Sequence, residues 1–477
     1  MSAQKTITIV GATGTQGASV ARTFLELPNW QVRCLTRHPT SEKAIELEKR
    51  GAELVQGDLE DEASLQRAFD NVHAVFLNTD FWIPFRKAMA LGKDAVTSSQ
   101  EAYEIEVMHG KNAAKVAASI PTLERFIYSA LGPMKKASNG KYPSSYHWET
   151  KASIVDYIEG HQLELARKTS YVYIGAYITN AFLYPKFDPE SESYVSILPT
   201  GKETRFPIIN VPRSTGPFVR ALVVDEEPRT RLLAYDDYLS VGEVGAIWTR
   251  TLGKEVKLIQ LTMEAMSAKT GVPVEILMGA AYLGEYSYCA GVSNVIEPIH
   301  LKTPIETQTF ETWLKEQDAM ELLELNNYST QAEIGRGPQA QPQVTWTVTA
   351  LTLLDPTTPK WHNAWPQLIR DVPRIVEAAR VEITGPTHND KIITPVLADI
   401  NHGTYLNGVP GNSSEPLAIQ GQKGTFKFVK TARKPYDVVV TCILLRAYNL
   451  APGIFSLRLS DDWIKGKELT SVSGPRK

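Results

Sequence analysis

A glycine-rich turn lies near the start of this chain, between a short apolar run and the beginning of a helical pattern. Residues 6–20 read TITIVGATGTQGASV, with glycines spaced three apart at Gly11, Gly14 and Gly17. In a dinucleotide-binding turn, the first glycine lets the chain leave a buried strand tightly, and the second lets the backbone approach a pyrophosphate. The third lets the following helix pack closely on the strand. The order therefore predicts a phosphate-binding βαβ unit; a tight turn in an unliganded α/β sheet is the alternative.

Three further strands are predicted downstream, at Trp30–Thr36, Ala52–Gln56 and Ala74–Leu77. Arg37 directly follows the first of them, where folds that prefer NAD carry an acidic residue for the ribose 2′-hydroxyl. An arginine at this place pairs with a 2′-phosphate, which predicts NADP(H) as the cofactor. An ordinary solvated arginine after a strand is the competing interpretation.

Polar residues also follow the other two strands. Asp58 comes just past the second, where an adenine would rest, but it equally suits the cap of a short helix predicted at Ser64–Phe69. Asn78 and Thr79 follow the third strand and are expected to face the same crevice. Both strand ends therefore contribute candidate cofactor contacts.

Several motifs taken together resemble the NmrA-like family, whose members are atypical relatives of the short-chain dehydrogenases/reductases. They are GATGTQG, TRHP, QGDLED, VFLNT and FIYSAL, followed by EVMHGKNAAKVAASI, HWETKASIVDYIE, YITNAF, LPTG and TGPFVRALV, and they span about residues 5–320. The resemblance implies a Rossmann-type doubly wound parallel sheet that binds NADP(H), with a small α/β substrate lobe at about 180–330. It also implies an oxidoreductase-type enzyme, in secondary metabolism. By the same match, cofactor contacts are expected from Gly11, Ala12, Thr13, Gly14, Thr15, Gln16, Gly17, Arg37, Thr40, Ser41, Asp58, Leu59, Asn78, Thr79, Lys151, Tyr177 and Asn180.

The expected catalytic motif departs from that of ordinary short-chain reductases. Those enzymes carry Tyr-x-x-x-Lys on one helix, where the lysine binds the nicotinamide ribose and the phenol passes a proton to the carbonyl that receives hydride. This chain has His147-x-x-x-Lys151 at the matching place, with Tyr146 displaced by one residue. His147 and Lys151 share a helix face, whereas Tyr146 is rotated by about 100°. Either His147 replaces the acid, or the dehydrogenase chemistry is lost.

Each catalytic candidate has a structural alternative. His147 would look the same if it only satisfied a backbone group, and Lys151 if it were a solvated surface lysine. Ser129 stands at the position of the usual carbonyl-polarising serine, where it would equally cap a turn. Tyr146 is the next candidate if His147 is structural.

Composition excludes several other classes of protein. The 477 residues carry a net charge of only −3 and no basic stripe, so nucleic acid is not an expected partner. There is neither an apolar signal region nor a run of 18 apolar residues, so a cytoplasmic protein with no membrane partner is expected. Cys34, Cys289 and Cys442 are too few and too scattered for a disulfide framework or a zinc site, and no metal is expected.

One compositional break divides the chain. Residues 331–342 combine Gly, Pro and Gln without apolar periodicity, which predicts a linker between a unit at 1–330 and a C-terminal domain at 343–477. The family resemblance does not cover this domain, whose role stays open. Its pattern indicates an α+β domain with strands at Val344–Leu354, Val381–Thr384 and Gly424–Lys430 and a helix at Trp365–Ala379. Pro435–Tyr448 is interpreted as a second helix because of its initial proline and late arginine, although its three valines equally suit a strand.

Three segments are candidates for lining a substrate site. They are the aromatic stretch 80–86 (DFWIPFR), the tyrosine-rich stretch 280–291 and the glycine-bearing polar loop 399–411 (DINHGTYLNGVPG), with core packing or a simple turn as the alternatives.

Two functions remain. One is an NADP(H)-dependent enzyme on a medium-sized organic small molecule, either a reductase or an isomerase that keeps the cofactor structurally. The other is an NADP(H)-sensing regulator that binds a protein partner. The aromatic stretch favours the enzyme; oligomeric state stays open.

Overall fold

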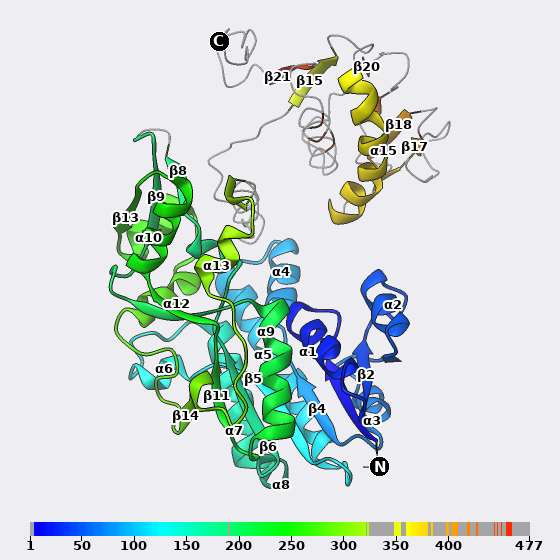
Figure 1. Cartoon of the computed structure of the whole chain (residues 1–477), viewed down its shortest axis with the longest axis vertical. Coiled ribbons are helices and arrows are strands. Elements are labelled where there is room, and N and C mark those ends of the chain that lie inside the picture. Colours follow the sequence, from blue (N-terminus) through cyan, green and yellow to red (C-terminus); the bar gives the residue numbers. More distant parts are fainter. Residues whose placement is uncertain are drawn as a thin grey trace. The chain divides into compact units, whose positions relative to one another are not determined.

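The computed structural model describes most of the N-terminal two thirds of the chain and separate parts of the remainder (Figure 1). The chain divides into two compact units, Met1–Gln341 and Pro342–Lys477. The predicted linker at 331–342 lies outside the described residues. These are 4–188, 191–320 and 322–323, then 348–353, 359–379, 383–384, 397–399, 403–408, 417–419, 426–427, 443, 446, 450 and 455–459.

The first unit is built on an eight-stranded parallel sheet with the order β14-β11-β6-β5-β4-β1-β2-β3. All residues of β4 and β6 are buried, as a parallel sheet covered on both faces requires. Strand order reverses between β1 and β4, and ligands of such sheets bind outside the carboxyl ends at this reversal. The strands are β1 (Lys5–Val10), β2 (Trp30–Thr36), β3 (Glu53–Gln56), β4 (Ala74–Leu77), β5 (Arg125–Ala130), β6 (Thr169–Ile174), β11 (Arg231–Ala234) and β14 (Val295–Ile296).

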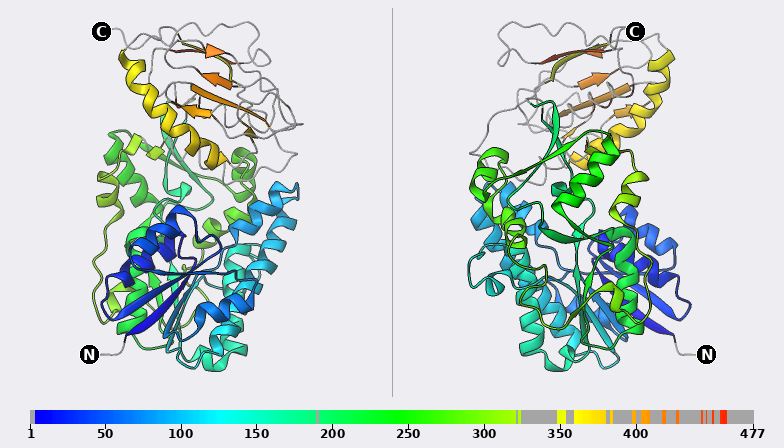
Figure 2. Two further views of the ribbon diagram at one scale, coloured as in Figure 1. Left: turned by 90° about the vertical axis from the view of Figure 1, so that its right-hand side faces the viewer. Right: turned by 60° about the vertical axis from the view of Figure 1, so that its left-hand side comes forward.

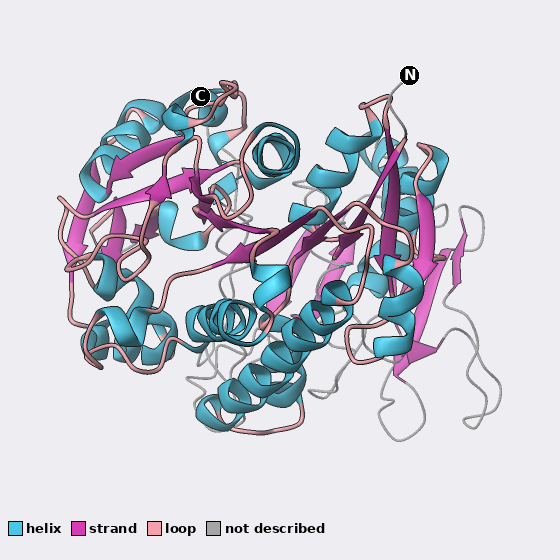
Figure 3. Cartoon of the chain, turned by 90° about the horizontal axis from the view of Figure 1, so that it is seen from below, coloured by secondary structure: helices cyan, strands magenta, loops and turns pink. Residues whose placement is uncertain are grey.

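Helices cover both faces of this sheet, so the fold is the predicted doubly wound α/β type (Figure 3). Side chains of α1, α2 and α9 pack in the core on one face, and those of α3, α5 and α7 in the core on the other. The bounds are α1 (Thr15–Leu25), α2 (Glu42–Lys49), α3 (Glu62–Phe69), α5 (Ala95–Ala118), α7 (Tyr146–His161) and α9 (Val211–Arg220), which continues into the π-helical turn η2 (Ala221–Asp225).

A smaller lobe follows, with two three-stranded sheets, β12-β10-β7 and β13-β9-β8. Helix α10 packs against β12 and β13, with Trp248 in the lobe's core. The strands are β7 (Ala176–Tyr177), β8 (Lys186–Asp188), β9 (Ser193–Leu198), β10 (Arg205–Ile209), β12 (Asp237–Ser240) and β13 (Val256–Gln260). The remaining helices of the first unit are α4 (Trp82–Ala90), α6 (Met134–Ala137), α8 (Leu163–Ala166), η1 (Ala181–Leu183), α10 (Val241–Leu252), α11 (Met263–Thr270), α12 (Val274–Leu283), η3 (Pro298–His300) and α13 (Phe310–Lys315).

The described parts of the second unit are one long helix and short antiparallel strands (Figure 2). The helix α15 (Pro359–Ala379) buries Trp361, Trp365, Leu368 and Val372, whose spacing places them on one face. Strand β15 pairs with β21, and β18 pairs with β16, β17 and β19. The strands are β15 (Val348–Leu353), β16 (Ile383–Thr384), β17 (Leu397–Asp399), β18 (Gly403–Gly408), β19 (Leu417–Ile419), β20 (Phe426–Lys427) and β21 (Phe455–Leu459).

Two sequence predictions for this unit were wrong in detail. The helix begins at Pro359, not Trp365, and it holds Pro366 and Pro373 in its interior. The stretch 399–411 is not a simple polar loop, because β17 and β18 pair there as antiparallel strands with Asp399 opposite Gly403. The predicted helix at 435–448 falls almost wholly outside the described residues. Among the helices that are described, none is both long enough and apolar enough to cross a membrane.

Candidate functional site

The glycine turn has the geometry of a phosphate loop. Gly11 has a φ of +78°, which suits glycine, and its carbonyl accepts a hydrogen bond from the Gly14 amide at 2.9 Å. Helix α1 starts immediately afterwards, at Thr15; no described side chain caps it and its first turn carries no acidic residue. Its first amide groups therefore point outward without a side-chain partner, as an anion site at a helix start requires.

Gly17 is required by packing, and substituting it should be costly. A Cβ at this position would lie less than 3.0 Å from the Gly11 carbonyl oxygen, a distance that real Cβ atoms essentially never show. We expect Gly17→Val to lower the free energy of unfolding by about 1–3 kcal/mol, because α1 must move away from the turn. The matched control is Gly160→Ala in α7, where a Cβ meets nothing within 4 Å. It should be neutral or stabilising in urea denaturation; equal losses for both variants would contradict the packing role.

The ends of β2 and β3 border an open hollow of about 730 Å³. It is lined by Arg37 and Asp58 among other residues, and the exposed Arg37 side chain makes no ion pair with any residue that the structure describes. Asp58 does not cap the following helix, so that interpretation was wrong. The cap is Asp61, whose Oδ1 accepts from the Ala63 amide at 3.0 Å. The Asp58 carboxyl instead accepts from the Glu60 amide, at the edge of the hollow.

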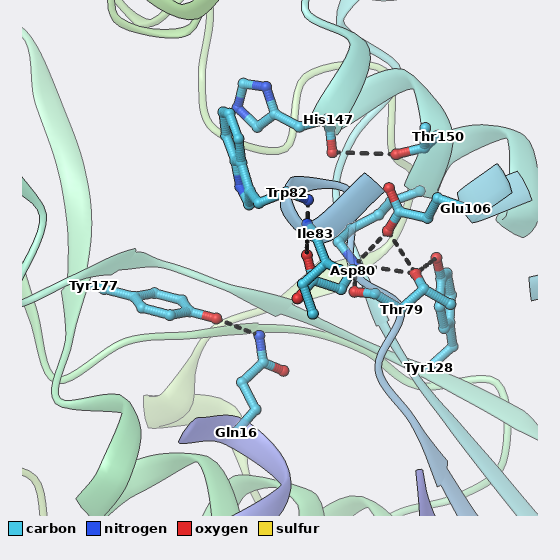
Figure 4. Close-up of polar contacts among 11 residues, drawn as sticks. Gln16, Thr79, Asp80, Trp82, Ile83, Glu106, Tyr128, His147, Thr150 and Tyr177 are labelled. Atoms are coloured by element: carbon cyan, nitrogen blue, oxygen red, sulfur yellow. Dashed lines mark hydrogen bonds and ion pairs between the residues drawn. The ribbon is translucent and has the colours of Figure 1, made fainter. Parts of the chain in front are cut away.

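The Lys151 ammonium group reaches the segment after β4, where Thr79, Glu106 and Tyr128 form a cluster of buried polar groups (Figure 4). It donates to the Thr79 carbonyl at 3.1 Å and to Thr79 Oγ1 at 3.2 Å, and forms an ion pair with Glu106 Oε1 at 3.2 Å. Thr79 Oγ1 donates to the same Glu106 oxygen at 2.6 Å and lies 3.2 Å from the Tyr128 hydroxyl. The lysine is thus not a solvated surface residue.

His147 occupies the same face of α7 as Lys151, as the spacing predicted. Its ring lies beside that of Trp82, with centroids 5.0 Å apart, at the start of α4 (Figure 4). Burial, and secondarily the charge of Lys151, lower the pKa of His147 to about 4. The imidazole is therefore neutral at physiological pH. Tyr146 points elsewhere, with its ring edge-on to Tyr103 of α5 at 6.2 Å.

Gln16 and Tyr177 come from opposite sides of the crevice and meet there. Gln16 Nε2, in the first turn of α1, donates to the Tyr177 hydroxyl of β7 at 2.6 Å (Figure 4). Gln16 Oε1 is buried and has no hydrogen-bond partner among the described residues.

Ser129 is buried within β5, not at a turn, so its role as a cap was wrong. Of the other predicted contacts, Thr40 and Ser41, Leu59 and Asn78 follow the carboxyl ends of β2, β3 and β4, whereas Asn180 follows β7 of the smaller sheet β12-β10-β7.

Glu106 is a member of the site that sequence reasoning missed. It lies in α5 with a fully buried side chain, and its Oε2 has no hydrogen-bond partner among the described residues. The signal was present in the sequence, because Glu106 falls on the same helical stripe as Gly110, Ala113 and Ala117, which are small and buried. A carboxylate in such a stripe needs a buried cationic partner.

Most of the aromatic candidates belong to the core. Phe81 and Phe85 are only 4% and 3% exposed, which leaves Trp82 as the partly exposed member of that stretch. Tyr282 and Tyr288 are likewise buried, and the Tyr288 hydroxyl donates to the Ile174 carbonyl.

Separately, Asp58, Glu60 and His109 bring one potential ligand atom each within 4.8 Å of one another, although acidic groups often gather so without an ion.

The fold and this sheet edge define a doubly wound α/β protein with a dinucleotide-type phosphate loop. The model of the NmrA-like family matches residues 3–314, and the chain belongs to that family. The family assignment made from the motifs is confirmed.

Curated relatives are similar over part of this chain. The NmrA-like family domain-containing oxidoreductase himF of Aspergillus japonicus is 25% identical over 285 residues, which is 56% of this chain and 79% of the relative. The oxidoreductase cpsB of Aspergillus campestris is 28% identical over 272 residues, or 54% and 76% of the two chains.

Solved structures of similar fold include Nmra, a negative transcriptional regulator, in complex with NADP. It has a TM-score of 0.47 at 20% identity and covers 69% of this chain and 97% of its own. The leucoanthocyanidin reductase–NADPH complex from Vitis vinifera has a TM-score of 0.49 at 15% identity, covering 65% and 98%. At these levels the similarity concerns the fold alone.

Proposed function

We propose that this protein is an NADP(H)-dependent oxidoreductase that acts on the carbonyl group of a medium-sized organic molecule, in secondary metabolism. The observation that carries the proposal is the placement of His147 and Lys151 on one face of α7, beside the carboxyl ends of β4 and β5. Several relatives are named oxidoreductases, which supports the same class.

The residues present fit an NADP(H) molecule. The uncapped start of α1 and the unpartnered Gln16 Oε1 would face the pyrophosphate and its riboses. Arg37, without an ion pair among the described residues, would hold the 2′-phosphate, and Asp58 with Leu59 would meet the adenine. Lys151 would bind the nicotinamide ribose. When bound, NADPH supplies a hydride.

The chain's own groups would then orient and polarise the substrate. Lys151 would bind the ribose and so orient the cofactor. His147, neutral because of its lowered pKa, would donate a hydrogen bond from its ring N–H to the carbonyl oxygen and stabilise the negative charge that develops there, and that oxygen would then take its proton from solvent water. Trp82 beside it provides an apolar surface for the substrate's body.

Cofactor preference tests the binding half of this proposal. We expect NADPH to bind at least about tenfold more tightly than NADH, and Arg37→Ala to cost roughly 1–3 kcal/mol of NADPH affinity with little change for NADH. The matched control is Arg167→Ala, which should leave both affinities unchanged. Arg167 is an exposed arginine just before β6, at the amino ends of the parallel strands. Calorimetry measures all of these; equal affinity of the parent protein for the two cofactors would be decisive against the assignment.

Turnover tests the catalytic half. NADPH consumption should appear with at least one member of a panel of aromatic ketones, aldehydes, enones and quinones. Tight NADPH binding with no consumption on the panel would instead support the isomerase or the NADP(H)-sensing regulator.

A further inference from the structure

We propose that Glu106 is the positioning residue for Lys151: its carboxylate provides the fixed counter-charge that holds the ammonium group at the crevice. The inference deepens the proposed function and rests on it for the role of Lys151. The contact itself does not depend on a cofactor. Glu106 is on α5 and Lys151 on α7, so the pair joins two helices on one face of the sheet.

The contacts of the Lys151 ammonium group differ in kind. It has three protons and donates two hydrogen bonds, to Thr79 O and Thr79 Oγ1, while Glu106 Oε1 lies 3.2 Å away as its ion-pair partner. Thr79 thus uses two of the protons, and the third can be donated to a ribose hydroxyl. The Thr79 oxygens are neutral, whereas the Glu106 carboxylate is charged and fully buried. Glu106 therefore supplies the counter-charge of the ammonium group, and a bond to the ribose does not require this ion pair to break.

Helix packing brings the two charges together. A Cβ at Gly110 would lie less than 3.0 Å from three atoms of Ile154, so the absence of a side chain lets α5 and α7 approach closely. Gly110 is one turn beyond Glu106, and Ile154 is three residues beyond Lys151. One turn before the carboxylate, the Tyr103 hydroxyl lies 2.8 Å from Ser153 Oγ. Contacts on both sides of the ion pair thus fix the separation of the helices.

Burial gives the carboxylate a role beyond packing. The Glu106 side chain is 0% exposed and that of Lys151 13%, so neither charge is well hydrated. Thr79 Oγ1 donates to the same carboxylate oxygen, and the Tyr128 hydroxyl contacts Thr79 in turn. This chain of contacts holds Glu106 Oε1 in place, and Oε1 in turn holds the ammonium group where β4 ends.

The first arm of the test needs no cofactor. In the full-length protein, the rate at which an N-hydroxysuccinimide ester acylates Lys151 is measured by peptide mass spectrometry. We expect Glu106→Gln to speed acylation about tenfold, because the ammonium group loses its charged partner. Glu106→Asp, which keeps the charge on a shorter side chain, should give an intermediate rate and serves if the glutamine variant does not fold. Tyr103→Phe is the matched control: it removes one hydrogen bond between the same two helices without changing charge, and because the close approach of Gly110 and Ile154 stays, the rate should be unchanged.

The second arm is a double-mutant cycle in NADPH binding. Glu106→Gln should weaken binding about tenfold in the parent protein but have no effect in a Lys151→Met background, because it acts through the lysine. Unchanged acylation in both Glu106 variants, or equal acceleration by Tyr103→Phe, overturns the inference. A parent protein that does not bind NADPH overturns the proposed function instead, and the acylation arm then still decides the role of Glu106.

Discussion

Lys151→Met should lower the free energy of unfolding by about 3–5 kcal/mol, the usual cost of leaving a buried charge without its partner. The substitution keeps the length and apolar stem of the side chain but removes the ammonium group. The Glu106 carboxylate, 0% exposed, then keeps the Thr79 hydroxyl as its only hydrogen-bond partner among the residues that the structure describes. Urea denaturation followed by tryptophan fluorescence measures the change.

Adding Glu106→Gln to the Lys151→Met protein should restore most of this loss, because the second substitution removes the stranded charge. The matched control is Lys115→Met. Lys115 lies in α5, is 61% exposed and pairs with Glu62 at 2.7 Å. Its removal should have little effect, since solvated ion pairs contribute little. If Lys151→Met is as stable as Lys115→Met, the buried ion pair does not carry the stability assigned to it.

His147→Leu should lower turnover by roughly 10²–10⁴, with little change in NADPH affinity, because leucine removes the ring N–H that would polarise the substrate carbonyl. His147→Gln keeps a hydrogen-bond donor of similar size and should retain more of the rate. The parent enzyme's turnover should be nearly flat between about pH 6 and pH 9, because the imidazole with a pKa of about 4 is neutral throughout. A rate that falls tenfold per pH unit above pH 4 would instead identify the imidazolium as the acid.

Stability gives a readout of the same histidine without a substrate. Because the folded pKa of about 4 lies below the unfolded value of 6.5, the neutral form contributes stability above pH 6.5 that is lost as the pH falls. The parent protein should therefore lose up to about 1.4 kcal/mol per pH unit relative to His147→Gln between pH 6.5 and pH 4. Full activity of His147→Leu on the true substrate would make the histidine structural.

The sequence predicted the phosphate loop because that loop depends on local backbone requirements. The backbone at Gly11 has a positive φ, and a side chain at Gly17 would collide with the Gly11 carbonyl. Both positions therefore require glycine, and their spacing can be recognised in the sequence. The strands β2 and β4 were predicted with their bounds unchanged. β4 (AVFL) is a continuous buried apolar run, as in a parallel strand covered on both faces, whereas β2 (WQVRCLT) includes polar residues and is buried mainly towards its carboxyl end. The shared face of His147 and Lys151 followed from helical periodicity alone.

The cap at Asp61, the hairpin of β17 and β18, and the early start of α15 were not predictable in the same way. In each case the local sequence allowed several options, such as Asp58 or Asp61 as the helix cap. Packing and backbone hydrogen bonds decided between them.

The sequence by itself determined where the first parallel strands end, where the glycine turn lies and which polar residues follow those strand ends. These features follow from periodicity and from the stereochemistry of single residues. Only the tertiary structure decided what Lys151 binds, which way Tyr146 points and how far the pKa of His147 falls. Those properties depend on side chains from α4, α5 and β4 that lie 40 to 70 residues away in the chain. Charge pairing and desolvation act through space, and a single sequence contains no record of which distant groups they join.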